Sequence, residues 1–262
     1  MDQKRAMISG AASGLGLEFC RLLAADRYDL ILVDKHASGL DKASKELHET
    51  YGIQTDAHCI DLSVQGAGQE LFEAVQNQEI DILINNAGFG VYGFFAETPW
   101  EVEEAMLQLH VLALTHLSKL MVQKMIRRGS GRILNVSSLA ALQPGPLMNI
   151  YYASKAYIYS FSRALANELK GTGVSVSVLL PGLFNTSFAS TTARNSGAPV
   201  KREKHRTTSV EQVAVMALKG MMKGKSRIIP GWKNRAMARA SQLLPVSLVM
   251  AVLRLTQERI RK

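Results

Sequence analysis

The sequence predicts an α/β protein built on a doubly wound parallel sheet with helices on both faces. Short apolar runs alternate with longer helical patterns along the chain, and this alternation is typical of βαβ units. Glycine-rich or polar motifs directly follow several apolar runs, at the edge where such sheets bind ligands. The 262 residues, 47% of them apolar, suit one domain over residues 1–262 with a full core, although the length alone allows two.

The first predicted strand, R-A-M-I-S, runs into a glycine-rich turn and then into a helix. Gly10, Gly14 and Gly16 mark this turn, with Ser13 and Leu15 between them. Glycine lets the backbone approach a pyrophosphate closely, and the amides at a helix N-terminus can bind it. The turn could also serve only to pack the helix on the strand. It lacks the G-K-[ST] of nucleoside triphosphatases, which argues against that class.

Acidic and amide side chains close the next three predicted strands. The run Y-D-L-I-L-V ends at Asp34, eighteen residues after Gly16, where an acid that binds ribose is expected. The residues that follow the third and fourth strands are Asp61, Leu62, Asn85, Asn86, Ala87 and Gly88. Because parallel strands end at one edge of a sheet, we expect these side chains to meet there.

A serine, a tyrosine and a lysine form the most informative pattern. Tyr151 and Lys155 lie four residues apart in Y-Y-A-S-K, and Tyr151 follows Ser138 by thirteen residues. In a helix from 150 to 170 the phenol and the ammonium would share one face, about 5 to 6 Å apart at Cβ. The cation would then lower the tyrosine pKa from near 10 by about 1 to 3 units. Ser138 could hold a substrate oxygen that Tyr151 protonates or deprotonates. A lone Y-x-x-x-K is usually a solvated helix face.

In this order, the motifs resemble those of the short-chain dehydrogenase/reductase family, over nearly all of residues 4 to 230. The family's glycine motif, N-N-A-G, serine and Y-x-x-x-K map onto the residues named above. Its P-G-x-x-x-T maps onto Pro181, Gly182 and Thr186, which in the family border the nicotinamide. The resemblance is strongest to bacterial members with I-P-G and a basic C-terminal helix.

The resemblance implies a Rossmann fold of about seven strands in the order 3-2-1-4-5-6-7, ending with S-R-I-I-P-G. It also implies a substrate lid over residues 185–208 and a C-terminal helical extension over residues 231–262. Helices from Pro99 to Arg128 and from Ile150 to Lys170 would supply the family's usual dimer faces. We therefore expect a homodimer or homotetramer.

The implied activity is that of an NAD(P)-dependent oxidoreductase that interconverts a secondary alcohol and a ketone or aldehyde. Tyr151 would be the general acid/base, and Lys155 would also hydrogen-bond the nicotinamide ribose. Apolar loops around the site suggest a hydrophobic small molecule as substrate. Their candidate lining residues are Phe89, Tyr92, Phe94, Phe95, Leu142, Met148 and Phe184.

NAD(H) is the favoured cofactor and NADP(H) is possible. Asp34 can accept hydrogen bonds from both ribose hydroxyls and would repel a 2′-phosphate, and Ser13 supplies no basic partner. Lys35 weakens the preference, because a base just after the acid could turn towards a phosphate. The expected cofactor-binding residues are Gly10, Ser13, Gly14, Leu15, Gly16, Asp34, Lys35, Asp61, Leu62, Asn86, Ala87, Gly88, Tyr151, Lys155, Pro181, Gly182 and Thr186.

One position departs from the family pattern. The family usually has an asparagine in the long helix before the serine, where this chain has His110. In the family that asparagine's backbone carbonyl anchors a water that links the lysine to solvent, and a carbonyl survives any substitution. His110 could keep this relay and exchange protons itself, since its unperturbed pKa is near 6.5. Alternatively it only fills a helix face and activity is reduced. We count it with Ser138, Tyr151 and Lys155 as a catalytic candidate.

The formal charge of +9 is not accompanied by a nucleic-acid motif, so nucleic acid is not an expected partner. The densest basic stretches are Lys201 to Arg206 and the C-terminal tail. The tail also carries an apolar run too short to span a bilayer. It could cover a neighbouring subunit, roof the active site or lie on anionic lipid. We favour protein contacts and keep membrane-surface contact as possible.

Two rival functions stay open: a cofactor-binding scaffold that senses redox state, and a peripheral membrane protein that acts through its basic C-terminal helix. The intact Ser138, Tyr151 and Lys155 count against the scaffold. Because only a few residues precede the first predicted strand, we expect no signal peptide and a cytoplasmic location. Cys20 and Cys59 are expected to be core residues without a disulfide, and no histidine spacing suggests a metal site.

Overall fold

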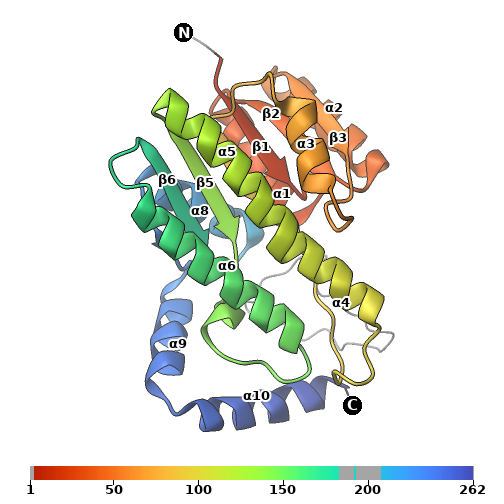
Figure 1. Ribbon diagram of the computed structural model, residues 1–262, viewed down its shortest axis with the longest axis vertical. Helices are drawn as coiled ribbons and strands as arrows, with labels where there is room; N and C mark the ends of the chain where they lie inside the picture. The colour runs from red at the N-terminus through yellow and green to blue at the C-terminus, as the bar shows by residue number, and fades with distance from the viewer. Residues whose placement is uncertain (1–2, 183–191, 193–207, 262) are drawn as a thin grey trace.

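The structure, a computed structural model, describes residues 3–182, 192 and 208–261. Its described residues form a parallel sheet of seven strands in the order β3-β2-β1-β4-β5-β6-β7, which confirms the predicted fold and strand order (Figure 1). The strands are β1 (Arg5–Ser9), β2 (Asp29–Asp34), β3 (Thr55–Cys59), β4 (Ile82–Asn85), β5 (Gly131–Val136), β6 (Val174–Leu179) and β7 (Arg227–Ile228). Ile8 of β1 pairs with Leu32 of β2 and with Ile84 of β4, so β1 is a central strand.

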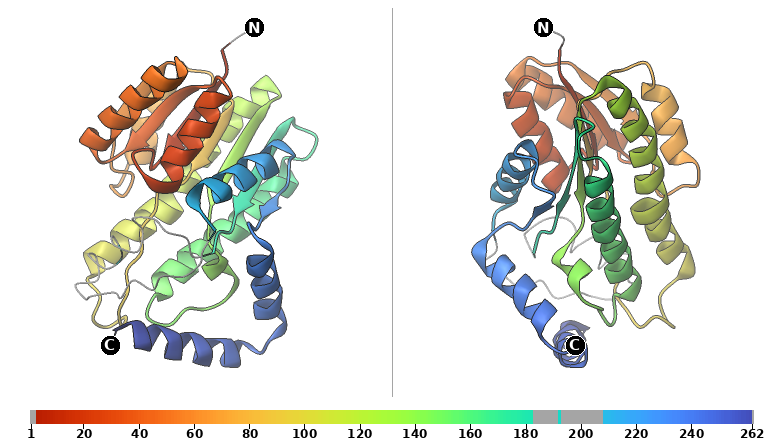
Figure 2. Two further views of the ribbon diagram at one scale, coloured as in Figure 1. Left: turned by 180° about the vertical axis from the view of Figure 1, so that it is seen from behind. Right: turned by 60° about the vertical axis from the view of Figure 1, so that its left-hand side comes forward.

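Helices cover both faces of the sheet, as the two layers in Figure 2 show. On one face lie α1 (Gly14–Ala25), α2 (Ala37–Tyr51) and α8 (Val210–Met222). On the other face lie α3 (Ala67–Val75), α5 (Leu114–Arg128) and α6 (Asn149–Glu168). The sheet is therefore doubly wound, with its strands buried from both sides.

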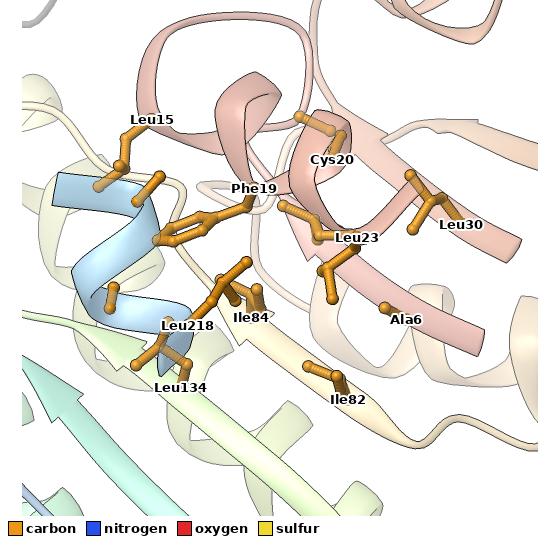
Figure 3. Close-up of a cluster of buried hydrophobic side chains, with 14 of the residues drawn as sticks. Ala6, Leu15, Phe19, Cys20, Leu23, Leu30, Ile82, Ile84, Leu134 and Leu218 are labelled. Atoms are coloured by element: carbon orange, nitrogen blue, oxygen red, sulfur yellow. The ribbon is translucent and has the colours of Figure 1, made fainter. Parts of the chain in front are cut away.

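The strands supply both cores by alternation. Met7 of β1 packs into the core under α3 and α5, whereas its neighbours Ala6 and Ile8 pack under α1. Figure 3 shows Phe19 of α1 in the core that contains Ala6 and Ile8, close to Leu218 of α8. Each such large apolar side chain contributes about 1.5 to 3 kcal/mol when fully buried. This packing fixes the carboxyl ends of the strands, where the predicted motifs lie.

Several elements surround the carboxyl edge of the sheet. Helix α4 (Trp100–Leu107) continues through a π-helical segment, η1 (Gln108–Ala113), into α5. A short 3₁₀ helix, η2 (Leu139–Leu142), follows β5. Helices α9 (Trp232–Leu243) and α10 (Val246–Arg261) form the C-terminal part of the described chain.

One described helical run, Trp100–Arg128, is long and apolar enough to cross a bilayer. It comprises α4, η1 and α5, and 44% of its most apolar window is buried within the fold. Burial within the fold therefore accounts for part of its apolar composition.

Two expectations differ from the structure. Cys59 is exposed rather than in the core, because β3 is an edge strand whose residues alternate towards solvent, whereas Cys20 is buried as expected. The last strand is shorter than S-R-I-I-P-G and spans Arg227–Ile228. The predicted lid, 185–208, lies outside the described residues except for Thr192 and Thr208.

Candidate active site

The glycine turn meets the end of β4 at close range. Gly10 has a φ of +70°, and a Cβ there would lie 2.8 Å from Nδ2 of Asn86. That amide nitrogen donates to the carbonyl of Ser9 at 2.9 Å. Glycine is thus required at position 10 both by the backbone conformation and by the space that Asn86 fills.

Ser9, which the sequence patterns did not single out, joins the two strand ends. Its hydroxyl accepts hydrogen bonds from the amides of Asn86 and Ala87 at 3.0 and 3.1 Å. It donates to the carbonyl of Ile84 at 3.4 Å. The N-N-A-G segment is thereby held beside the N-terminus of α1, which begins at Gly14 just after Ser13. Leu15 and Gly16 are buried at this helix end.

Asp34 is fixed by the backbone around the turn. Its carboxylate accepts from the amide of Ala12 at 3.1 Å and from the amide of His36 at 3.1 Å. It ends β2 beside the glycine turn and is partly exposed.

Lys35 and Asp61 interact with each other. Nζ of Lys35 lies 3.5 Å from Oδ2 of Asp61 and 5.9 Å from the ring centroid of Phe89. Burial of Asp61 opposes its ionisation, but hydrogen bonds from Ser63 and the charge of Lys35 outweigh this and lower the pKa of Asp61. Leu62, next to Asp61, is buried in the core.

The predicted serine, tyrosine and lysine come together at the ends of β5 and α6. Tyr151 and Lys155 are 9% and 4% exposed, and Nζ of Lys155 lies 5.7 Å from the centroid of the Tyr151 ring. Ser138 hydrogen-bonds the phenol of Tyr151, and its own oxygen accepts from the amide of Ala140 at 3.1 Å. Lys155 donates to the carbonyl of Val136 at 3.1 Å.

The pKa of Tyr151 does not follow the expectation from sequence. Burial raises the pKa of Tyr151, and the hydrogen bond from Ser138 offsets only part of this effect. Burial also lowers the pKa of Lys155 to about 7, so this lysine loses its proton more readily than an exposed one. The predicted lowering of the tyrosine pKa is therefore wrong for the chain by itself, because desolvation of the phenol is the largest effect.

His110 is fully enclosed, with 1% of its surface exposed. Its Nε2 accepts from the amide of Phe89 at 3.3 Å, so the ring proton resides on Nδ1, which donates to Oγ of Ser154 at 2.9 Å. The Ser154 hydroxyl in turn donates to the carbonyl of Tyr151 at 2.8 Å. Burial, together with the charge of Lys155, lowers the pKa of His110 well below 6.5. A neutral ring with both nitrogens engaged is poorly suited to exchanging protons.

Gly88, the last residue of N-N-A-G, lies against the same group. A Cβ at Gly88 would be 2.8 Å from Nε2 of His110 and 3.3 Å from Nζ of Lys155. His110 thus connects the end of β4 with the helix that carries Tyr151 and Lys155. The π-helical segment that contains it was not predicted, because no residue pattern distinguishes one extra residue per turn.

A buried network of polar side chains connects the strands and helices that carry the candidate site residues. Asn85 donates to Oδ1 of Asn135 at 2.8 Å, and Asn135 donates to Oγ of Ser162 at 2.9 Å. Asn85 also lies 3.1 Å from Oγ of Ser118. These bonds connect β4, β5, α5 and α6, and satisfied buried networks of this kind specify a unique packing.

The apolar surroundings of Tyr151 agree in part with the predicted lining. Val91, Met106 and Ala140 form a buried cluster with Tyr151, and Phe89 and Met148 pack against it. Phe94 and Phe95 are exposed, and Leu142 packs in a separate cluster with Leu139. The remaining two predicted lining residues are Tyr92, which is buried, and Phe184, which lies outside the described residues.

The P-G-x-x-x-T segment is described only at its start. Pro181 is buried after β6, and its carbonyl accepts from the amide of Leu139 at 3.0 Å. Gly182 lies against Asn234 of α9, leaving no room for a larger residue. Thr186 lies outside the described residues.

Known proteins match most of the chain in sequence. The family profile described as short chain dehydrogenase matches residues 4–197. The ketoacyl reductase HetN of Nostoc sp. is 32% identical over 220 residues, which cover 82% of this chain and 75% of that protein.

Two solved structures are similar over almost their full lengths. One, from work on 7β-hydroxysteroid dehydrogenase stereoselectivity, has a TM-score of 0.85 at 25% identity, covering 95% of this chain and 96% of that one. The other, a short-chain dehydrogenase from Sphingobium yanoikuyae in complex with NADPH, has a TM-score of 0.81 at 27% identity, covering 90% and 91% of the two chains.

Proposed function

This chain belongs to the short chain dehydrogenase family and is an NAD(P)-dependent oxidoreductase, and from that premise we propose that it reduces hydrophobic ketones, or oxidises the corresponding secondary alcohols, at Tyr151. The observation that carries the proposal is the buried phenol of Tyr151, hydrogen-bonded by Ser138 and close to Lys155. These groups lie at the carboxyl edge of the sheet, where doubly wound folds bind their ligands.

The residues present fit a dinucleotide. The backbone of the glycine turn, from Gly10 to Gly16, would face the pyrophosphate, and the carboxylate of Asp34 would accept from the ribose hydroxyls. N-N-A-G and Pro181 follow the ends of β4 and β6 at the same edge of the sheet, and Lys155 offers a buried donor to the second ribose. When bound, the nicotinamide supplies or accepts the hydride at the carbinol carbon.

Tyr151 and Ser138 would manage the proton at the substrate oxygen. Because burial raises the pKa of Tyr151, the phenol of the chain by itself is protonated at neutral pH, which is the form that a carbonyl reduction consumes. The Ser138 hydroxyl, already directed at the phenol, would donate to the same oxygen and orient it. In the reverse direction Tyr151 takes the alcohol proton back.

The substrate would be largely hydrophobic. Val91, Met106 and Ala140 bury one side of Tyr151, and Phe89 and Met148 add partly exposed apolar surface. Two of the similar proteins are named for ketoacyl and hydroxysteroid chemistry, and both names describe a carbonyl or alcohol on an apolar body. Pockets of this composition select substrates by the apolar area that they bury.

NAD(H) is the cofactor that we propose as preferred. Asp34 ends β2 with its charge beside the glycine turn, where it would repel a 2′-phosphate. Lys35, the residue after Asp34, is engaged by Asp61 and lies over Phe89, which leaves it less available to a phosphate. One similar structure was solved in complex with NADPH, so the fold can also accommodate the phosphorylated cofactor.

His110 would act as a positioning residue. Its hydrogen bonds fix the amide of Phe89, after β4, and the hydroxyl of Ser154 on α6, next to Lys155. Loss of the ring would therefore loosen the end of β4 relative to α6. Its role does not need a change of charge.

We also propose a homo-oligomer that uses the face formed by α5 and α6. This face exposes Ile126 and Tyr157, and Tyr157 stacks on Phe161 with ring centroids 5.9 Å apart. Light scattering should report a species larger than 28.7 kDa; that mass alone would contradict an oligomer.

A screen of carbonyl compounds and alcohols, monitored by NAD(P)H absorbance, tests the proposed reaction. The panel should contain bulky apolar ketones, including 3-oxoacyl and steroid ketones, together with small polar ones. We expect turnover to favour the bulky apolar compounds. Cofactor binding without turnover of any compound would instead support a redox-sensing scaffold.

A further inference from the structure

Helix α10 exposes apolar side chains over most of its described length. Leu248, Val252 and Leu255 are 51%, 56% and 61% exposed, and their i, i+4, i+7 spacing puts them on one face. Val249 and Leu253, on the neighbouring face, are only half-buried. The exposed face of α10 therefore has little packing among the described residues, and helices in proteins gain most of their stability from packing.

Aromatic residues are exposed at the same end of the molecule. Phe95, in the segment between β4 and α4, is 58% exposed, and Trp100, at the start of α4, is 55% exposed. Figures 1 and 2 place this segment and α10 at one end, the end towards which the arrowheads of β1 and β5 point. We call the exposed apolar residues of this end the end surface: Phe95, Trp100, Leu248, Val252 and Leu255.

Positive charge is concentrated in the same part of the chain. Residues 231–262 contain seven lysines and arginines and one glutamate, a net charge of +6 out of +9 for the whole chain. Lys233, Arg235 and Arg239 on α9 and Arg254 on α10 are all exposed. Basic side chains beside an apolar face attract anionic lipid headgroups.

We propose that α10 and the end surface dock this protein on an anionic lipid bilayer, with α10 lying in the plane of the headgroups. Amphipathic basic helices with aromatic neighbours bind membranes in this way. The apolar stretch Val246–Thr256 is too short to span a bilayer, which needs about 20 residues.

Contact with a second copy of the chain fits less well, because a symmetric contact would place the same positive surfaces against each other. Docking on lipid would turn the carboxyl edge of the sheet, where Tyr151 lies, towards the bilayer, in which an apolar ketone dissolves.

Vesicle co-sedimentation of the full chain tests this inference without any need for turnover. The vesicles are phosphatidylcholine alone or phosphatidylcholine mixed with phosphatidylglycerol. We expect binding to the anionic vesicles that weakens as salt rises. Neutralising Arg235→Gln and Arg239→Gln should weaken binding by about fivefold for each charge.

The apolar contribution is tested by the double variant Leu248→Glu with Val252→Glu. It should abolish sedimentation with anionic vesicles while the protein keeps the wild-type circular dichroism spectrum. The matched control is Thr50→Glu, an exposed position near the C-terminal end of α2 that lies outside both the end surface and the proposed subunit face, and it should bind as wild type. Equal binding by the double variant would overturn the proposal. So would wild-type protein that binds no vesicles but dissociates into smaller species when Leu248 and Val252 are replaced, because α10 would then be a subunit contact.

Discussion

The buried active site and the exposed helix α10 lie at the same end of the molecule, but they are held in opposite ways. In the site, Asn86, His110 and Lys155 each bond to the backbone or side chains of neighbouring elements. In α10, by contrast, Leu248 and Val252 are more than half exposed. The site is thus fixed by the fold itself, whereas much of the apolar surface of α10 is exposed in the described chain. Changes in the site should alter chemistry, and changes in α10 should alter where the protein binds.

The largest combined effect on turnover and stability should come from the buried cation. Lys155→Met removes the donor near Tyr151 while filling similar space, and turnover should fall by about 10². The same change should stabilise the fold, because a buried lysine costs free energy that a methionine does not. Activity assays and thermal unfolding of one purified variant measure both effects.

The pH dependence of that stabilisation follows from the lysine pKa. Burial lowers the pKa of Lys155 to about 7 from 10.5, so the unfolded chain binds this proton more tightly than the folded chain. The stability penalty of the wild type is therefore fully present below about pH 7 and disappears as the pH rises towards 10.5. The Tm advantage of Lys155→Met should be larger at low pH than at high pH. An advantage that grows with pH would contradict the buried-cation account.

His110 should matter less than Lys155, and through position only. His110→Ala should lower kcat/KM by about tenfold, and His110→Asn, which restores a donor and an acceptor, should recover much of the loss. A limb of the pH–rate profile near pH 7 would belong to Lys155 and should persist in both variants. Disappearance of that limb in both would show that His110 itself titrates.

Cofactor choice should depend on the single charge of Asp34. Asp34→Asn removes the repulsion of a 2′-phosphate and should shift the ratio of NADPH to NADH affinity by about tenfold towards NADPH. Fluorescence titration with both cofactors measures the two Kd values. Tighter binding of NADPH than of NADH by the wild type would refute the proposed preference.

The smallest effect on chemistry should come from α10. Leu248→Glu with Val252→Glu should leave kcat/KM for a water-soluble ketone within about twofold of wild type, because these residues contact solvent in the described chain. Steady-state assays in the absence of lipid measure this. A large loss would place α10 over the active site of this chain or of a neighbouring subunit.

Features set by local backbone geometry could be predicted from the sequence, whereas features set by burial between distant segments could not. Strand order and the convergence of Ser138, Tyr151 and Lys155 follow from motifs whose spacing is set by backbone geometry. The direction of the Tyr151 pKa shift could not be predicted, because it depends on how completely distant segments remove water from the ring. The hydrogen bonds of Ser9 and Ser154 were equally hidden, since serines occur throughout the chain without a distinctive pattern.

Comparison of Tyr151→Phe with Tyr152→Phe tests the central claim most directly. Both variants lose one phenolic hydroxyl and keep the ring, but Tyr151 is the residue hydrogen-bonded by Ser138, whereas the Tyr152 ring packs on Gly145. Single-turnover assays with saturating cofactor should show a fall of at least about 10² for Tyr151→Phe and nearly wild-type rates for Tyr152→Phe, with cofactor affinity kept in both. Near-wild-type turnover by Tyr151→Phe would contradict its assignment as the general acid/base.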